Sequence, residues 1–210
     1  MRPELRALDI ADPPERWESL GFNVGSDTRQ SRSGACELGG VRLSLGCPGT
    51  GIIGWTLTGI SGETASIDGL PTHFENNSWP PPPPHHPNGA IAIDHVVVTT
   101  ADFDRTAAAL EAVGMALRRV VPRPDGRRMG FRRLGPAILE LVETKEGPDG
   151  PARFWGLVVV VEDLDAMPDR LGERLGPIRA AVQPGRRIAT VRQSAGLGEA
   201  VAFMSPQTGH

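Results

Sequence analysis

Several classes of protein are excluded by what the sequence has little of. Two cysteines, Cys36 and Cys47, are too few for the disulfide framework of a small secreted protein. The apolar run at residues 157–161 is far shorter than a membrane-spanning helix requires. No charged segment followed by an apolar stretch opens the chain, as a secretion signal would. We therefore expect a cytoplasmic protein without a membrane partner.

Lysine is almost absent, since Lys145 stands alone beside 21 arginines. This skew is typical of a GC-rich bacterial genome and indicates no particular function. The net charge of −3 argues against general nucleic-acid binding. The sequence contains no P-loop, dinucleotide-binding fingerprint, CxxC pair or nucleophile elbow. Their absence removes the commonest phosphate-binding, redox and hydrolase classes.

Glycine and proline are abundant, with 26 and 20 among 210 residues, which excludes a long helical protein. The length suffices for a substantial buried core. Five consecutive prolines at 80–84 lie in the segment NNSWPPPPPHHPNG and favour a stiff polyproline II conformation. We interpret residues 71–90 as a linker between two domains.

A β-α-β-β-β pattern follows the linker. Residues 91–100 are rich in β-branched side chains and predict a strand, and residues 106–113 predict a helix that ends at Gly114. Three further strands are predicted at residues 116–121, 128–134 and 137–142, with turns at the intervening Pro and Gly residues.

The same pattern returns 61 residues later. Asp163-Leu164-Asp165 occupies the place of Asp102-Phe103-Asp104, after a predicted strand at 154–162 and before a helix that ends at Gly176. Strands are then predicted at residues 178–182, 187–192 and 200–204. A repeat of this size indicates duplicated structural units. We therefore divide residues 91–206 into two modules, 91–144 and 153–206.

A third copy precedes the linker. Residues 36–45, CELGGVRLSL, align without gaps on residues 132–141, RRLGPAILEL, after a predicted strand at 5–10 and a helix at 12–21. Residues 51–60 look like the first strand of a fourth copy that has no convincing remainder. Residues 1–70 are thus predicted to be a degenerate domain of one module and a remnant.

Residues 93–114, IDHVVVTTADFDRTAAALEAVG, followed by 131–143, FRRLGPAILELVE, resemble the glyoxalase/bleomycin-resistance/extradiol-dioxygenase superfamily, in particular a glyoxalase-like protein of actinobacterial type. Its members are also called vicinal oxygen chelate proteins. The resemblance implies an α+β fold in which paired βαβββ modules form curved, cup-shaped mixed sheets. It leaves the activity open, because the superfamily includes isomerases, epimerases, dioxygenases, thiol transferases and drug-binding proteins.

The resemblance also implies a metal site. In catalytic members, each module supplies a His from its first strand and a Glu from its last strand to a divalent metal (Zn, Mn, Fe, Ni or Co), which chelates two substrate oxygens. His95 and Glu140 stand at these places in the first module, whereas Gly156 and about Phe203 occupy them in the second. Two ligands are fewer than catalytic zinc sites use. The remaining candidates to complete the set are His73, His85, His86, Gln183 and Glu199.

Structural interpretations compete with these assignments. His95 fits a hydrogen-bonded strand histidine, and His85–His86 fits a solvated pair beside the prolines. The seven arginines between residues 118 and 133 are typical of the charged outer faces of strands. Trp55 and Trp155 occupy matching places in their copies and predict packing between modules.

Two functions follow as alternatives. The first, which we favour, is a small-molecule-binding protein that sequesters a drug or metabolite in a cup lined by Trp155, Phe203, Met204 and Phe131. The second is a metal-dependent lyase, isomerase or dioxygenase that acts on a small metabolite through His95 and Glu140. In both we expect a homodimer.

Overall fold

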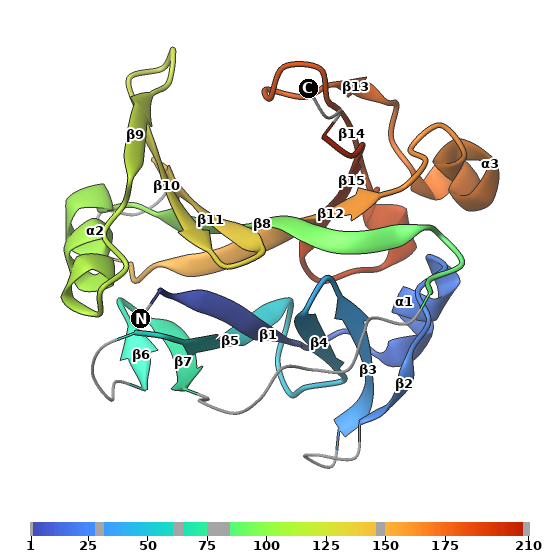
Figure 1. Cartoon of the computed structure of the whole chain (residues 1–210), viewed down its shortest axis with the longest axis horizontal. Helices are drawn as coiled ribbons and strands as arrows, with labels where there is room; N and C mark the ends of the chain where they lie inside the picture. The colour runs from blue at the N-terminus through green and yellow to red at the C-terminus, as the bar shows by residue number, and fades with distance from the viewer. Residues whose placement is uncertain (1, 28–31, 61–64, 75–84, 146–149, 208–210) are drawn as a thin grey trace.

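Two mixed β-sheets of seven and eight strands lie one above the other (Figure 1). The structure is a computed structural model that describes residues 2–27, 32–60, 65–74, 85–145 and 150–207. The five prolines of the predicted linker lie outside these residues. Among the described helices, none is long and apolar enough to cross a membrane.

The eight-stranded sheet contains both modules of the C-terminal half, in the order β13-β14-β15-β12-β8-β11-β10-β9. The first module comprises β8 (Ala90–Thr100), α2 (Phe103–Ala112), β9 (Arg119–Pro122), β10 (Arg128–Leu134) and β11 (Ala137–Glu143). The second comprises β12 (Arg153–Val161), α3 (Met167–Leu171), β13 (Arg179–Ala180), β14 (Arg187–Thr190) and β15 (Ala200–Met204), with short 3₁₀ turns at Gly172–Arg174 and Gln193–Ala195. The outer strands rise away from the other sheet and form the walls of a cup (Figure 1).

The two modules pair within one chain through their first strands. β8 and β12 run antiparallel, with His95 opposite Val158 and Val97 opposite Gly156. This register is what a two-fold axis between the strands requires if residue 95 corresponds to 156 and residue 97 to 158. Residues that are 61 positions apart in the sequence are therefore related by an approximate two-fold axis of the sheet.

The seven-stranded sheet has the order β2-β3-β4-β1-β5-β7-β6. One complete module consists of β1 (Glu4–Ile10), α1 (Pro14–Ser19), β2 (Gly25–Asp27), β3 (Arg32–Leu38) and β4 (Val41–Leu45). The remainder of the fourth copy, which the sequence did not reveal, is present as β6 (Ser66–Ile67) and β7 (Leu70–Phe74). β7 runs parallel to β5 (Ile52–Thr58), as β15 does to β12. A strand as short as β6 leaves too little periodicity to detect.

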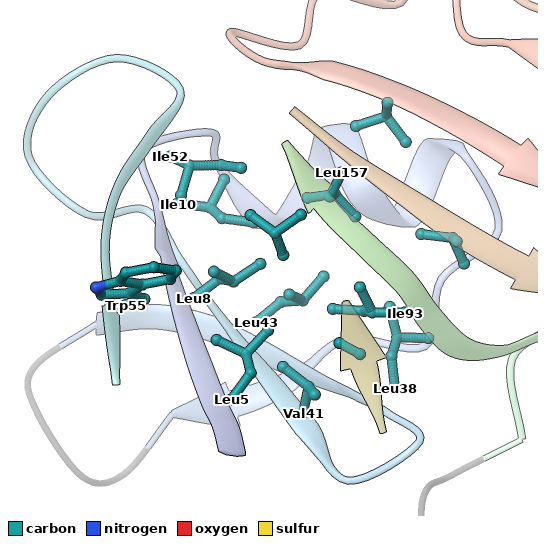
Figure 2. Close-up of a cluster of buried hydrophobic side chains, with 14 of the residues drawn as sticks. Leu5, Leu8, Ile10, Leu38, Val41, Leu43, Ile52, Trp55, Ile93 and Leu157 are labelled. Carbon is teal, nitrogen blue, oxygen red and sulfur yellow. The ribbon is translucent and has the colours of Figure 1, made fainter. Parts of the chain in front are cut away.

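A single buried cluster fills the space between the sheets (Figure 2). Leu8, Leu43 and Trp55 reach it from the seven-stranded sheet, and Ile93 and Leu157 reach it from the eight-stranded sheet. All five side chains are almost fully buried. Each buried side chain of this size contributes about 1.5–3 kcal/mol. The N-terminal half is thus packed on the convex face of the cup and leaves the concave face open.

Polar contacts fix the two halves at both ends. The carboxylate of Asp68, in the β6–β7 turn, accepts hydrogen bonds from Arg105 Nε at 2.7 Å and from the Thr106 hydroxyl, both in α2. At the other end, Asp12 accepts a hydrogen bond from the Gly198 N–H at 3.0 Å. These contacts hold the eight-stranded sheet on the seven-stranded sheet at two separate points.

Candidate functional site

The concave face of the eight-stranded sheet contains a cavity of about 450 Å³. Its floor is formed by β8, where His95, Val97 and Thr99 point into the cavity while Val96 and Val98 point into the core. This alternation follows from the two-residue period of a strand. The other lining residues are Arg123, Arg127, Glu140, Val142, Thr144, Trp155, Leu157, Val158, Ile188, Thr190, Ala200, Val201 and Ala202.

His95 and Glu140 form the polar end of the cavity. Nε2 of His95 lies 3.3 Å from Oε2 of Glu140, and both side chains are largely buried. Burial raises the pKa of the Glu140 carboxyl, although the nearby His95 and Arg123 act in the opposite direction. The two residues that the sequence identified are therefore partners of each other in the structure.

Asp94 completes this arrangement because of an irregularity in β8. The register with β12 passes from His95 opposite Val158 to Ile93 opposite Val159, so Asp94 is an extra residue without a counterpart. Such a bulge places adjacent side chains on one face of a sheet. Oδ2 of Asp94 accepts a hydrogen bond from Nδ1 of His95 at 2.8 Å. Strict alternation would have placed Asp94 in the core, which is why sequence reasoning missed it.

The second module contributes an arginine to the same group. Arg186 is 8% exposed and forms an ion pair with Asp94. It also donates hydrogen bonds from Nε to the Ser205 carbonyl at 2.9 Å and from Nη1 to Oε1 of Gln183 at 2.7 Å. Burial alone would raise the pKa of Asp94, but the hydrogen bonds from His95 and Arg186 lower it to about 2.

The positions related to His95 and Glu140 by the two-fold axis carry no metal-binding side chain. Gly156 corresponds to His95, and a Cβ at this glycine would lie 2.1 Å from the Ala200 carbonyl oxygen. Ala202 pairs with Val158 as Glu140 pairs with Val97, so Ala202 is the counterpart of Glu140. The sequence alignment, which placed this counterpart at about Phe203, was one residue out.

The four predicted ligand-binding residues do not all face the cavity. Trp155 lines it and is 56% exposed, because a second bulge, between Phe154 and Gly156, turns its indole outward. Trp155 therefore does not pack between modules as predicted, whereas Trp55 is fully buried. Phe131 lies opposite Glu140 on the neighbouring strand.

Met204 and Phe203 point to opposite faces of β15. Met204 packs with Val158 and Ala202 in a small apolar cluster next to the cavity. Phe203 is fully buried in the core, where its ring stacks on Phe22 with centroids 6.0 Å apart. A molecule in the cavity would meet Ala202 in place of Phe203.

The residues present do not fit a divalent metal. Within the described part of the chain, no three His, Cys, Asp or Glu side chains converge as a metal site requires. Both ring nitrogens of His95 already face carboxylates, and Gly156 and Ala202 offer no donor on the opposite side. The expected metal thus lacks the second half of its ligand set.

None of the additional ligands predicted from the sequence contacts His95 or Glu140, and only Gln183 lies near them. His73 faces Asp9 in the seven-stranded sheet, with Nε2 3.8 Å from Oδ2, and Gln183 contacts Asp94 and Arg186. Glu199 lies near Asp12, where burial raises its pKa to about 9.

His85 and His86 are not a solvated pair, as the sequence had indicated. His85 is exposed, but His86 is 1% exposed. Nδ1 of His86 accepts a hydrogen bond from the Asn23 N–H at 3.0 Å, and Nε2 lies 2.9 Å from the Glu37 carbonyl oxygen. His86 is therefore a structural residue that attaches the end of the linker to the N-terminal sheet.

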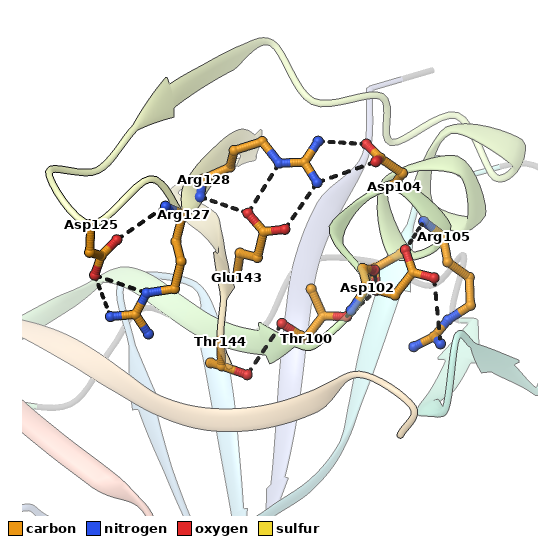
Figure 3. A network of polar contacts seen from close by, with 10 residues as sticks. Thr100, Asp102, Asp104, Arg105, Asp125, Arg127, Arg128, Glu143 and Thr144 are labelled. Atoms are coloured by element: carbon orange, nitrogen blue, oxygen red, sulfur yellow. Dashed lines mark hydrogen bonds and ion pairs between the residues drawn. The ribbon is translucent and has the colours of Figure 1, made fainter. Parts of the chain in front are cut away.

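The arginine-rich strands serve two purposes (Figure 3). Arg128 bridges Glu143 and Asp104, at 3.0 and 2.7 Å, and so ties β10 to β11 and α2. Arg123 and Arg127 line the cavity, and Arg127 is held by Asp125. The prediction that these arginines only charge the outer face of the strands is thus incomplete.

Comparison with known proteins gives a likeness in structure alone. No family model and no curated protein matches the sequence. A solved xylose isomerase-like TIM barrel/4-hydroxyphenylpyruvate dioxygenase fusion protein matches 99% of this chain with a TM-score of 0.67 and 10% sequence identity. The chain covers 49% of that protein's length.

Methylmalonyl-CoA epimerases match the chain over a shorter length. The epimerase from Mycobacterium tuberculosis matches 58% of this chain at 24% identity, with 91% of the epimerase covered and a TM-score of 0.47. A Streptomyces coelicolor epimerase in complex with 2-nitronate-propionyl-CoA matches 55% of this chain at 18% identity, with 94% of that chain covered and a TM-score of 0.45.

Proposed function

We propose that this chain, which has the vicinal oxygen chelate fold, binds a small organic molecule in the cup of the eight-stranded sheet and sequesters it without a divalent metal. The observation that carries this proposal is the unequal cavity, in which His95 and Glu140 face a second module whose lining residues are apolar apart from Thr190 and include no His, Cys, Asp or Glu.

The cavity has the composition of a small-molecule site. Most of its lining residues are apolar, Val97, Val142 and Val158 among them, and the polar ones include the adjacent His95 and Glu140. Such a combination fixes the orientation of a ligand while its apolar part is removed from water. Of the predicted ligand-binding residues, Trp155 lines the cavity and would cover a ligand, and Met204 packs beside Val158 and Ala202 of the apolar wall.

Thermal-shift screening of aromatic antibiotics and small metabolites tests this proposal. We expect at least one compound to stabilise the protein, by about 2.7 kcal/mol when its concentration is a hundred times its dissociation constant. Thr99→Phe introduces a large side chain that points into the cavity and should abolish the shift. Val120→Phe adds the same group at an exposed position of β9 outside the cavity and should leave the shift intact.

Metal analysis separates this function from the metal-dependent enzyme. Protein purified without chelator should carry no stoichiometric Zn, Mn, Fe, Ni or Co. A stoichiometric metal that disappears in His95→Ala would contradict the proposal and favour a lyase, isomerase or dioxygenase.

A further inference from the structure

A second cavity of about 510 Å³ adjoins the cup where β8 and β11 end and β12 begins. The two cavities share Thr99, Arg127, Thr144 and Trp155. The remaining residues of the second cavity are Thr100, Ala101, Lys145, Gly150, Pro151 and Arg153. A molecule that leaves the polar end of the cup along β8 therefore enters this space, which we call the mouth.

The mouth is basic. Arg127, Lys145 and Arg153 line it, and none of the described lining residues is acidic. Asp125 holds Arg127 through a hydrogen bond from Nε at 2.9 Å, so the charge of this arginine is largely balanced (Figure 3). Lys145 and Arg153 have no ion pair with any described residue, and both are exposed. Glu146 and Asp149 lie outside the described residues.

The sheet register orients Arg153 toward the cup. Arg153 lies opposite Thr99, whose side chain points into the cavity, so Arg153 projects from the same concave face. The exposed indole of Trp155 lies between the mouth and the cup and lines both. An aromatic surface beside two cations is suited to a ligand that is apolar along its length and anionic at its end.

The length of this ligand follows from strand geometry. His95 and Thr99 are four residues apart on β8, which corresponds to about 13 Å along an extended strand. A molecule that contacts His95 and Glu140 must therefore span this distance before its end reaches Arg153.

We propose that the mouth is an anion subsite, in which Lys145 and Arg153 bind the phosphate or carboxylate end of an organic anion whose apolar part occupies the cup. The inference rests on the proposed function, because the apolar part of the ligand needs the cup. It adds a ligand class, an elongated organic anion, and two specificity-determining residues.

Calorimetric titration with matched probes tests the subsite. Octyl phosphate, octanoate and octanol, each used below its critical micelle concentration, have similar apolar chains. They differ in the end group, which is a phosphate, a carboxylate and a neutral hydroxyl, respectively. We expect octyl phosphate or octanoate to bind at least about tenfold more tightly than octanol at low ionic strength, since hydrogen bonds between charged groups are roughly twice as strong as those between neutral groups. High salt should reduce this preference. The relative affinities of the two anions show whether the subsite prefers a phosphate or a carboxylate group.

Charge-removing variants locate the effect. Lys145→Gln combined with Arg153→Gln should abolish the preference for the anion and leave octanol binding within about twofold. The control Arg170→Gln, on the exposed surface of α3, should change neither affinity.

Two contrary results have different meanings. Equal binding of octanol and both anions, unchanged in the double variant, would overturn the anion subsite while the cup remains a binding site. Absence of binding by all three probes, in a protein that also fails the compound screen, would overturn the cup itself.

Discussion

At the scale of single residues, Asp94 connects the two modules of the cup. Its carboxylate lies between His95 of the same strand and Arg186 of the second module. Its ordinary pKa of 3.8 falls to about 2 in the folded protein. The charged form therefore stabilises the fold above pH 4, and this contribution is lost as the pH falls through 2.

Asp94→Asn should lower the free energy of unfolding by about 2–4 kcal/mol at neutral pH, because it removes the ionised partner and leaves Arg186 buried without a counter-charge. Urea unfolding at neutral pH measures this loss, and the difference from the parent protein should narrow as the pH falls from 4 toward 2.

Asp165→Asn is the matched control for this substitution. Asp165 also pairs with an arginine, Arg187, but both side chains are about half exposed or more. Screening by solvent makes such a pair weak, so the urea midpoint should not change. An equal loss in both variants would show that the burial of Asp94 has no special effect.

Glu140 should respond to pH in the opposite sense. Burial raises its pKa, so the folded protein binds a proton on this group at pH values where the unfolded chain has released it. Stability then falls as the pH rises above the ordinary value of 4.5. Glu140→Gln removes this titration, and its urea midpoint should exceed that of the parent protein at neutral pH and converge with it below pH 4. A lower midpoint at neutral pH would mean that the His95 contact outweighs the cost of burying the charge.

At the scale of elements, β12 shows why the second module cannot regain the missing histidine. A side chain at position 156 collides with the backbone of β15, since its Cβ would lie 2.1 Å from the Ala200 carbonyl oxygen. Gly156→Ala should therefore destabilise the protein by about 3 kcal/mol, as overpacking does in a rigid interior.

Chemical denaturation of Gly156→Ala and Gly25→Ala side by side checks this prediction. Gly25 is also a strand glycine, but a Cβ there meets nothing within 4 Å. Its substitution should change the free energy of unfolding by less than about 0.5 kcal/mol. If Gly156→Ala changes the free energy of unfolding equally little, β15 can move aside. A larger, metal-binding side chain at position 156 would then be sterically possible.

Sequence periodicity predicted the regular elements well, because strands with one buried face repeat every two residues. The strand expected at 128–134 is β10 (Arg128–Leu134), and the one expected at 200–204 is β15 (Ala200–Met204). The helix expected at 106–113 begins earlier, at Phe103, because the Asp102 side chain accepts a hydrogen bond from the Arg105 N–H and caps it. The second helix is shorter than expected and ends at Leu171.

Bulges account for most of what the sequence did not predict in the site. One extra residue at Asp94 and another at Trp155 reverse the inward and outward alternation locally. No glycine or proline flanks Asp94, whereas Gly156 follows Trp155, and a glycine inside a strand often marks a bulge. Phe203 was assigned to the wrong face because an alignment error of one residue exchanges the two faces of a strand. His95 adjoins the bulge but keeps its pairing with Val158, and Glu140 lies on a regular stretch, so the alternation predicted for both holds and both line the cavity.

At the scale of the whole molecule, the two sheets depend on each other. The convex face of the eight-stranded sheet buries Val96, Val98 and Leu157 against the N-terminal half. Separation of the halves would expose this face to water. We therefore expect one cooperative unfolding transition for the full chain in calorimetry, with equal calorimetric and van't Hoff enthalpies.

Residues 85–207 expressed alone provide the complementary measurement. This fragment should aggregate or associate, because an exposed apolar face of this extent is an association surface. Two separate transitions in the full chain, together with a monomeric and soluble fragment, would contradict the shared core.

The unequal halves of the cup also decide how a ligand can lie in it. In a cup with two identical modules, a bound molecule and its copy turned by half a rotation have the same energy, so two poses are populated equally. Here His95 and Glu140 occupy one side, and Gly156 and Ala202 the other, so the two poses differ in energy. The loss of symmetry between the modules therefore favours one of the two orientations that a bound ligand could adopt.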